Sequence, residues 1–224
     1  MLLSLLPVCI LFVRKVAVVA ILNVLKILCL FVILQYAAVY FIQPGFPTLQ
    51  PAFRLAEFTL VFYLFKLMMT SSQGKYFMNM LLVSFLSVVI TIYVLKGIEA
   101  YSEVLTIIQA GILTVLAFVI LSHLISNRQI VLVNEPGFWI TGGLLCFNGM
   151  VVLMEAIAGN HSDLSQQIQQ DKVLIITVAD MLRMVFFTVA ASVAGRKNGK
   201  NNDAENQSSP PPLPFPVNRR TIKY

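Results

Sequence analysis

Five charged side chains interrupt stretches of sequence that are otherwise strongly apolar, and they are the first candidates for chemistry. They occur as two pairs with i,i+3 spacing, Arg54 with Glu57 and Asp180 with Arg183, and as the single acid Glu155. Residues three apart are neighbours on one helix face, so each pair can form a local ion pair. Such groups can bind a small ligand, a lipid headgroup or a proton, and they can equally do no more than fix helix packing. Both interpretations are open at this point.

A sixth charged residue, Lys26, lies near the middle of another apolar stretch. Its ammonium group is too deep to reach an interface easily, so we expect it to pair with a carboxylate or with the amide dipoles of Asn23 and Gln35. The three cysteines and two histidines have no spacing typical of a metal site. We therefore expect neither a metal nor a cofactor.

The composition indicates the solvent in which these groups lie. The chain is 58% hydrophobic and 12% charged, against roughly 45–50% and about 25% in a soluble domain. A bilayer admits α-helices of roughly 20 apolar residues, because every backbone polar group must be hydrogen-bonded internally. The sequence therefore predicts an all-α, polytopic transmembrane helical bundle.

The apolar stretches predict about seven spans within residues 1–195, and the sequence carries no signal for a second folded domain. We expect the spans to cover residues 1–13, 16–42, 51–70, 76–95, 104–125, 138–158 and 173–194. The first span is short and contains Pro7, so three interpretations are open: a thin tilted span, a segment lying at the interface, or the remnant of a longer N-terminus.

Lysine and arginine residues in the short loops predict the orientation. Arg14, Lys15, Lys75 and Arg128 lie on the same side as the C-terminal tail, and the loops over 43–50, 97–103 and 159–172 are neutral to acidic. Basic loops stay in the cytoplasm, so we expect the N-terminus outside and the C-terminus inside.

This orientation places the acids and arginines of the spans in the outer half of the membrane. Asp180 lies roughly 10 Å below the outer end of the last span at 1.5 Å per residue, and Glu57 and Glu155 lie near the outer ends of theirs. The functional hypothesis is an outward-opening polar pocket. The structural alternative is two local ion pairs and a bundle contact from Glu155.

The segment after residue 195 differs sharply in composition from the spans. Residues 196–224 are basic and proline-rich, so we expect a disordered cytoplasmic tail. Its candidate contacts with anionic lipid or with a proline-reading partner are Arg196, Lys197, Pro211, Pro212 and Pro214. Although the formal charge is +6, the basic residues flank spans or lie in the tail, so nucleic-acid binding is not expected.

One long segment has a family likeness. The residues IQAGILTVLAFVILSHLISNRQIVLVNEPGFWITGGLLCFNGM (Ile108–Met150), together with PAFRLAEFTLVFYLF (Pro51–Phe65), resemble the seven-span membrane regions that precede bacterial sensor histidine kinases and also occur alone. Phe147 replaces the tyrosine expected after GGLL-x, and the tail has no phosphate-accepting histidine or nucleotide loop. The resemblance implies a sensory membrane region without its transmitter, in a bacterial inner membrane.

Together these observations favour a non-enzymatic, sensory-like or adaptor protein. It would couple an outer pocket to a cytoplasmic signalling partner, and it could form a homo-oligomer. The rival hypotheses are a small transporter or proton pathway using the buried carboxylates, a structural scaffold, and a membrane enzyme acting on lipid. The last is the weakest, since the acids and histidine of the outer loops are too sparse for a catalytic constellation.

Overall fold

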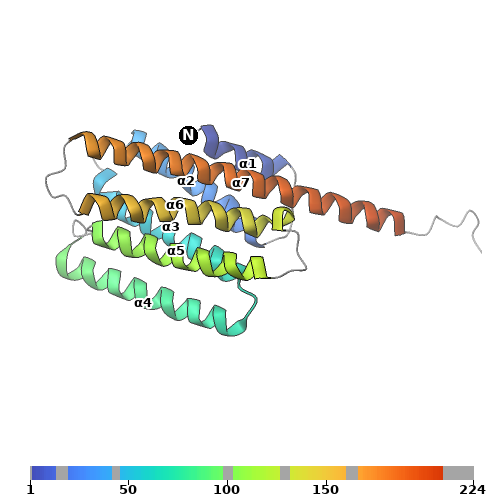
Figure 1. Cartoon of the computed structure of the whole chain (residues 1–224), viewed down its shortest axis with the longest axis horizontal. Helices are drawn as coiled ribbons and strands as arrows, with labels where there is room; N and C mark the ends of the chain where they lie inside the picture. The colour runs from blue at the N-terminus through green and yellow to red at the C-terminus, as the bar shows by residue number, and fades with distance from the viewer. Residues whose placement is uncertain are drawn as a thin grey trace, which may run out of the picture.

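The helices of this chain lie side by side along one common direction (Figure 1). The structure is a computed structural model, and it describes residues 2–13, 20–41, 46–97, 103–126, 132–159 and 166–208. All regular secondary structure within these residues is helical, which confirms the predicted all-α class. The helices are α1 (Leu2–Val13), α2 (Ala20–Phe41), α3 (Phe46–Met68), α4 (Ser72–Lys96), α5 (Glu103–Ser126), the 3₁₀ turn η2 (Leu132–Asn134), α6 (Pro136–Gly159) and α7 (Gln166–Ser208).

Five of these helices, α2, α4, α5, α6 and α7, contain stretches long and apolar enough to cross a membrane. The chain is therefore a multi-pass integral membrane protein. Helix α1 has 12 residues and is about 18 Å long at helical rise, which is short of the roughly 30 Å hydrocarbon layer. Helix α3 is long enough but includes Arg54, Glu57 and Lys66. The crossing of the membrane by α1 and α3, and the orientation of the bundle, stay predictions.

Local sequence signals explain several helix ends. The Ser71 hydroxyl accepts a hydrogen bond from the Gly74 amide at 3.4 Å before α4, an N-cap that satisfies one of the unpaired amides of the first turn. Gly97 ends α4 with a φ of 83°, a backbone conformation that glycine adopts at little cost. Helix α6 starts at Pro136, directly after Glu135, because proline is well suited to the first turn of a helix and an acid there favours the helix dipole.

Helix α7 differs at both ends from the predicted span over residues 173–194. It begins at Gln166 and continues to Ser208, so Lys172 lies in the helix rather than in the loop where we placed it. Residues 196–208 likewise continue the helix, whereas we expected an irregular tail from Arg196. No proline lies between Gln166 and Pro210, and an existing helix adds residues without a second nucleation step.

Six of the helices form a closed ring. Helix α1 packs against α2, α2 against α3, α3 against α5, α5 against α6, α6 against α7, and α7 against α1. Helix α4 packs mainly against α3 and lies at one edge of the bundle (Figure 1). The interior of the ring is the place where side chains from helices distant in sequence can meet.

Aromatic and aliphatic side chains fill much of that interior. Phe58, Phe62 and Phe65 of α3 are fully buried, and the Phe58 ring lies 4.5 Å from that of Phe85 on α4. Leu144 of α6 and Phe187 of α7 are also fully buried. This apolar packing lies closer to the Met68 end of α3 than the charged residues do, so it closes the bundle on one side of them.

Glycines allow α6 to lie close to α7. A Cβ atom added at Gly143 would lie 2.8 Å from Cβ of Phe186 and 3.4 Å from the Arg183 carbonyl oxygen. The helices could not approach so closely with a larger residue there, and small residues are the usual means of such packing in membranes. Gly142 also lies against Phe186, but a Cβ at Gly149 would meet nothing within 4 Å. Gly142 and Gly143 therefore set the position of the helix that carries Arg183.

Candidate binding cavity

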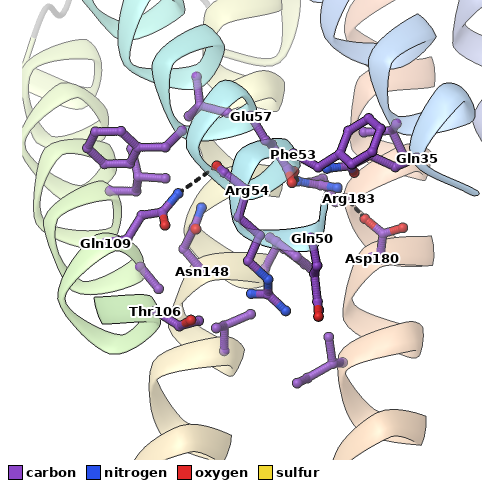
Figure 2. A pocket seen from close by; sticks show the side chains of 18 of the residues that line it. Gln35, Gln50, Phe53, Arg54, Glu57, Thr106, Gln109, Asn148, Asp180 and Arg183 are labelled. Carbon is purple, nitrogen blue, oxygen red and sulfur yellow. Dashed lines mark hydrogen bonds and ion pairs between the residues drawn. The ribbon is translucent and has the colours of Figure 1, made fainter. Parts of the chain in front are cut away.

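A cavity of about 270 Å³ lies within the ring, at the level of the charged residues. Side chains from five helices, α2, α3, α5, α6 and α7, line it, and Figure 2 shows them converging from these helices. Gln50, at the Phe46 end of α3, is exposed, so the cavity meets the surface there. Its polar lining consists of Gln35, Tyr36, Gln50, Arg54, Glu57, Thr106, Gln109, Asn148, Thr177, Asp180 and Arg183.

Arg183 is the centre of the charged network. It is only 3% exposed, and its Nη1 lies 2.6 Å from Oε1 of Glu57 on α3. Its Nη2 lies 2.5 Å from Oδ1 of Asp180, one turn away on α7. The predicted pairing of Asp180 with Arg183 is thus present, and the guanidinium also joins α7 to α3. A buried cation is tolerated when it is paired in this way.

Two aromatic residues complete the surroundings of this network. The Tyr36 hydroxyl of α2 donates a hydrogen bond of 2.6 Å to Oδ2 of Asp180. The Phe147 ring of α6 lies with its centroid 4.0 Å from Cζ of Arg183, close enough for a cation–π interaction. Nε of Arg183 is buried and has no hydrogen-bond partner among the described residues. Four helices, α2, α3, α6 and α7, therefore contribute to the environment of one guanidinium group.

Arg54 does not join Glu57 in the local pair that its spacing suggested. Figure 2 shows its side chain pointing away from Glu57, towards Gln50 and Thr106. No ion pair between the residues that the structure describes includes Arg54. Its carbonyl oxygen accepts a hydrogen bond of 2.9 Å from Nε2 of Gln109 on α5. The Arg54 guanidinium thus lies in the cavity, while its backbone fixes α3 to α5.

Glu155 forms a separate pair. Its Oε2 lies 2.6 Å from Nζ of Lys172, and the carboxylate is buried, with a side chain 7% exposed. Val151 and Ile176, each one turn further along the same helices, line the cavity, so this pair lies next to the cavity rather than in it. We expected Glu155 to make a bundle contact, and its partner is the lysine that we had placed in a loop.

Lys26 has a different neighbour from those we expected. Its Nζ lies 4.8 Å from the centroid of the Phe12 ring on α1, and the ion pairs between described residues do not include it. A cation over an aromatic face is stabilised by the ring quadrupole. Lys26 therefore links α2 to α1, away from the cavity.

Among the cavity residues that escaped the sequence interpretation are Tyr36, Gln109 and Asn148, and also Phe147, which we had noted only for the family likeness. The signal that could have found the first three is their polarity within otherwise apolar spans, at depths matching those of Glu57 and Asp180. Asn148 donates to the Leu144 carbonyl at 2.8 Å within its own helix, so its side-chain oxygen is left for other partners in the cavity lining. Phe147 carries no such signal, because phenylalanine is common throughout the spans.

The cavity has the chemistry of a binding site for polar molecules. Carboxylate, guanidinium, amide and hydroxyl groups line it together with apolar side chains such as Val32 and Val61. Among the described residues there is no group of three or more His, Cys, Asp or Glu side chains placed to hold a metal ion. Convergent polar groups in a mostly apolar pocket are typical of small-molecule sites.

The predicted contact residues of the tail fall largely outside this description. Arg196 and Lys197 lie within the helical continuation of α7, and Pro211, Pro212 and Pro214 lie outside the described residues. Their contacts with lipid or with a partner stay predictions.

Comparison of the chain with protein-family models, with curated proteins and with solved structures finds no match. The likeness to the membrane regions of sensor kinases therefore rests on the sequence segments that carry it.

Proposed function

We propose that this protein is a non-enzymatic, sensory-like component of a bacterial inner membrane. In this proposal the cavity faces the outside, and its state is passed through α7 to a partner in the cytoplasm. The cavity is the sensing element, and the continuation of α7 with the following tail is the output.

The course of α7 is the observation that carries this proposal. One uninterrupted helix runs from Gln166 to Ser208, and it includes both Asp180 and Arg183 of the charged network. A helix moves as a rigid element, so a shift of a turn or less at one end is felt at the other. The same element thus joins the cavity to the segment beyond the membrane.

The charge distribution supports the assignment of inside and outside. The predicted seven-span topology puts the basic residues of the short loops on the same side as the end of α7, and the positive-inside rule assigns that side to the cytoplasm. The acids and arginines of the cavity then belong to the outer half of the membrane. The likeness to sensor-kinase membrane regions agrees with a sensing role.

The packing beyond the cavity supports sensing over transport. The described residues that close the bundle towards the Met68 end of α3 are largely apolar and fully buried, among them Phe62, Phe65 and Leu144. A proton or solute relay needs polar groups that continue across the membrane. Lys26, the one charged residue of α2, contacts Phe12 and does not extend the charged network around Arg183.

Capture of cytoplasmic partners by four versions of the protein tests the proposal. They are the full chain, a chain ending at Gly195, a chain in which residues 196–224 are scrambled at constant composition, and the full chain with Asp180→Asn. We expect a specific partner with the full chain alone, and an altered recovery with Asp180→Asn, because that change weakens the network on α7. Equal recovery with all versions would contradict the proposed output.

A flux measurement in liposomes separates the transport hypothesis. The purified protein is reconstituted, and proton and solute movement is followed with and without Asp180→Asn. We expect no flux above that of protein-free liposomes. Flux that is present with the native chain and abolished by Asp180→Asn would replace the sensory proposal with transport.

A further inference from the structure

The charges that line the cavity balance in sum but not in position. Two arginines, Arg54 and Arg183, face two acids, Glu57 and Asp180, so the net formal charge is zero. Both acids contact the one guanidinium of Arg183. The network of Glu57, Asp180 and Arg183 therefore has a formal charge of −1, and Arg54 supplies the compensating +1 elsewhere in the cavity.

The two poles are separate in space. Figure 2 shows the Arg54 side chain extending towards Gln50 and Thr106, away from the ion pairs of Arg183. Arg54 and Glu57 lie about one helical turn apart along α3, which is about 5 Å of depth. A volume of about 270 Å³ has room for on the order of nine water molecules at liquid density. Charges in so confined a space are screened less than charges on the surface.

A ligand must match both poles to be bound well. A simple anion would satisfy Arg54 but bring a second negative charge towards the acids, and a simple cation would face Arg54 with like charge. Either would leave one pole without compensation at a cost in desolvation. A molecule with one group of each sign avoids this cost, and a guanidinium offers a carboxylate or phosphate two parallel hydrogen bonds.

We infer that the cavity binds a small zwitterion, with its anionic group on Arg54 and its ammonium group facing Asp180 and Glu57. The Gln50 amide and the Thr106 hydroxyl are placed to assist at the anionic end. At the other end the Tyr36 hydroxyl donates to Asp180, which leaves its oxygen lone pairs for an ammonium group. This inference rests on the proposed sensing cavity and names the class of molecule that it senses.

Probes that share the same carbon chain and differ only in their charged groups test the charge requirement. The purified protein in detergent is heated with 4-aminobutyrate, with butyrate or with butylammonium, and glycine and phosphoethanolamine vary the distance between the charges. We expect a zwitterion to raise the melting temperature by several degrees at saturation, and neither single-charge analogue to do so. An equal rise with butyrate would overturn the inference in favour of a plain anion site.

Two variants of α3 test the place of binding. Arg54→Gln removes the positive pole, so the shift caused by the zwitterion should vanish. Lys66→Gln removes the same charge from the other end of the helix, where Nζ lies 5.9 Å from the Tyr63 ring, and the shift should persist. A shift of native size in Arg54→Gln contradicts the inference.

The same chemistry occurs in free solutes and in zwitterionic lipid headgroups, and a second arm separates these sources. The protein is placed in nanodiscs of phosphatidylethanolamine or of phosphatidylglycerol. In one outcome the soluble probes have no effect, while phosphatidylethanolamine stabilises the native chain and not the Arg54→Gln variant. That result supports the inference, with a lipid headgroup as the ligand. Absence of any zwitterion effect in both arms overturns it. Partner capture is measured in a separate experiment. A failure of the zwitterion inference therefore shows in the melting temperatures, and a failure of the proposed signalling output shows in the partner capture.

Discussion

At the scale of single residues, the network depends on one guanidinium shared by two carboxylates. Glu57 and Asp180 both contact Arg183, and the three groups come from helices α3 and α7. Removal of Arg183 would leave two acids near each other in a buried site. By contrast Lys172 compensates a single acid, Glu155, and is 22% exposed.

Arg183→Met should therefore destabilise the protein strongly. Removal of one partner from a buried ion pair costs about 3–5 kcal/mol, and we expect a loss in this range in the free energy of unfolding, measured in mixed micelles by the loss of helicity. Lys172→Met is the matched control and should cost clearly less. Adding Glu57→Gln and Asp180→Asn to the Arg183 variant should recover part of the loss. Equal losses in the two single variants would refute the central role of Arg183.

Tyr36→Phe tests the contribution of α2 to the same network. It removes the hydrogen bond to Asp180 and keeps the ring, so we expect a loss of about 1 kcal/mol in the free energy of unfolding. Tyr40→Phe on the same helix is the control, because that residue is 74% exposed and should be neutral within error. If the Tyr36→Phe protein were as stable as the native chain, the hydrogen bond to Asp180 would contribute nothing to stability, because water could donate to Asp180 in its place.

At the scale of elements, the close approach of α6 and α7 fixes the depth and rotation of the helix that carries Arg183. The backbone of Arg183 and Cβ of Phe186 both lie against Gly143. A helix held at its backbone has little freedom to rotate, so the guanidinium is presented to Glu57 in one orientation.

Gly143→Ala should disturb this contact. The new Cβ would lie 2.8 Å from Phe186 Cβ, so the helices must separate, and overpacking of this kind costs roughly 1–3 kcal/mol. Gly149→Ala on the same helix meets nothing within 4 Å and should be neutral or stabilising by up to about 1 kcal/mol through helix propensity. The melting temperatures of the two variants and of the native chain are compared in one detergent. A Gly143→Ala protein more stable than the native chain would contradict the described α6–α7 contact.

At the scale of the whole molecule, the direction of the bundle decides which compartment the cavity faces. Helix α5 contains one of the apolar stretches that can cross the membrane, and residues 102 and 127 flank it. The predicted orientation places the first of these outside and the second in the cytoplasm.

Cysteine labelling at these two positions checks the orientation. Ser102→Cys and Asn127→Cys are introduced separately in a chain that lacks the exposed Cys9 and Cys146. A membrane-impermeant maleimide should modify the first variant in intact spheroplasts and the second only after permeabilisation. The reverse pattern would place the cavity towards the cytoplasm and would remove the basis for outward sensing.

The sequence by itself determined the helices and one of the two local pairs. Long apolar stretches must be helical in a membrane because their backbone groups have no other partners, so the helices lie close to the predicted spans. The i,i+3 spacing made the contact between Asp180 and Arg183 possible, since helical geometry places such residues on one face, and the contact is present. Charged residues in these stretches also had to lie inside the bundle, and Arg183 does.

The tertiary structure decided which side chains from different helices meet. Arg54 and Glu57 have the same spacing as Asp180 and Arg183, yet Glu57 contacts Arg183 and Arg54 points elsewhere. Tyr36 of α2 likewise meets Asp180 of α7, and Lys172 of α7 meets Glu155 of α6. Such contacts depend on the rotation and relative depth of whole helices, which are set by close approach at Gly143 and by the aromatic interior. The pattern of residues along one helix contains no measure of either.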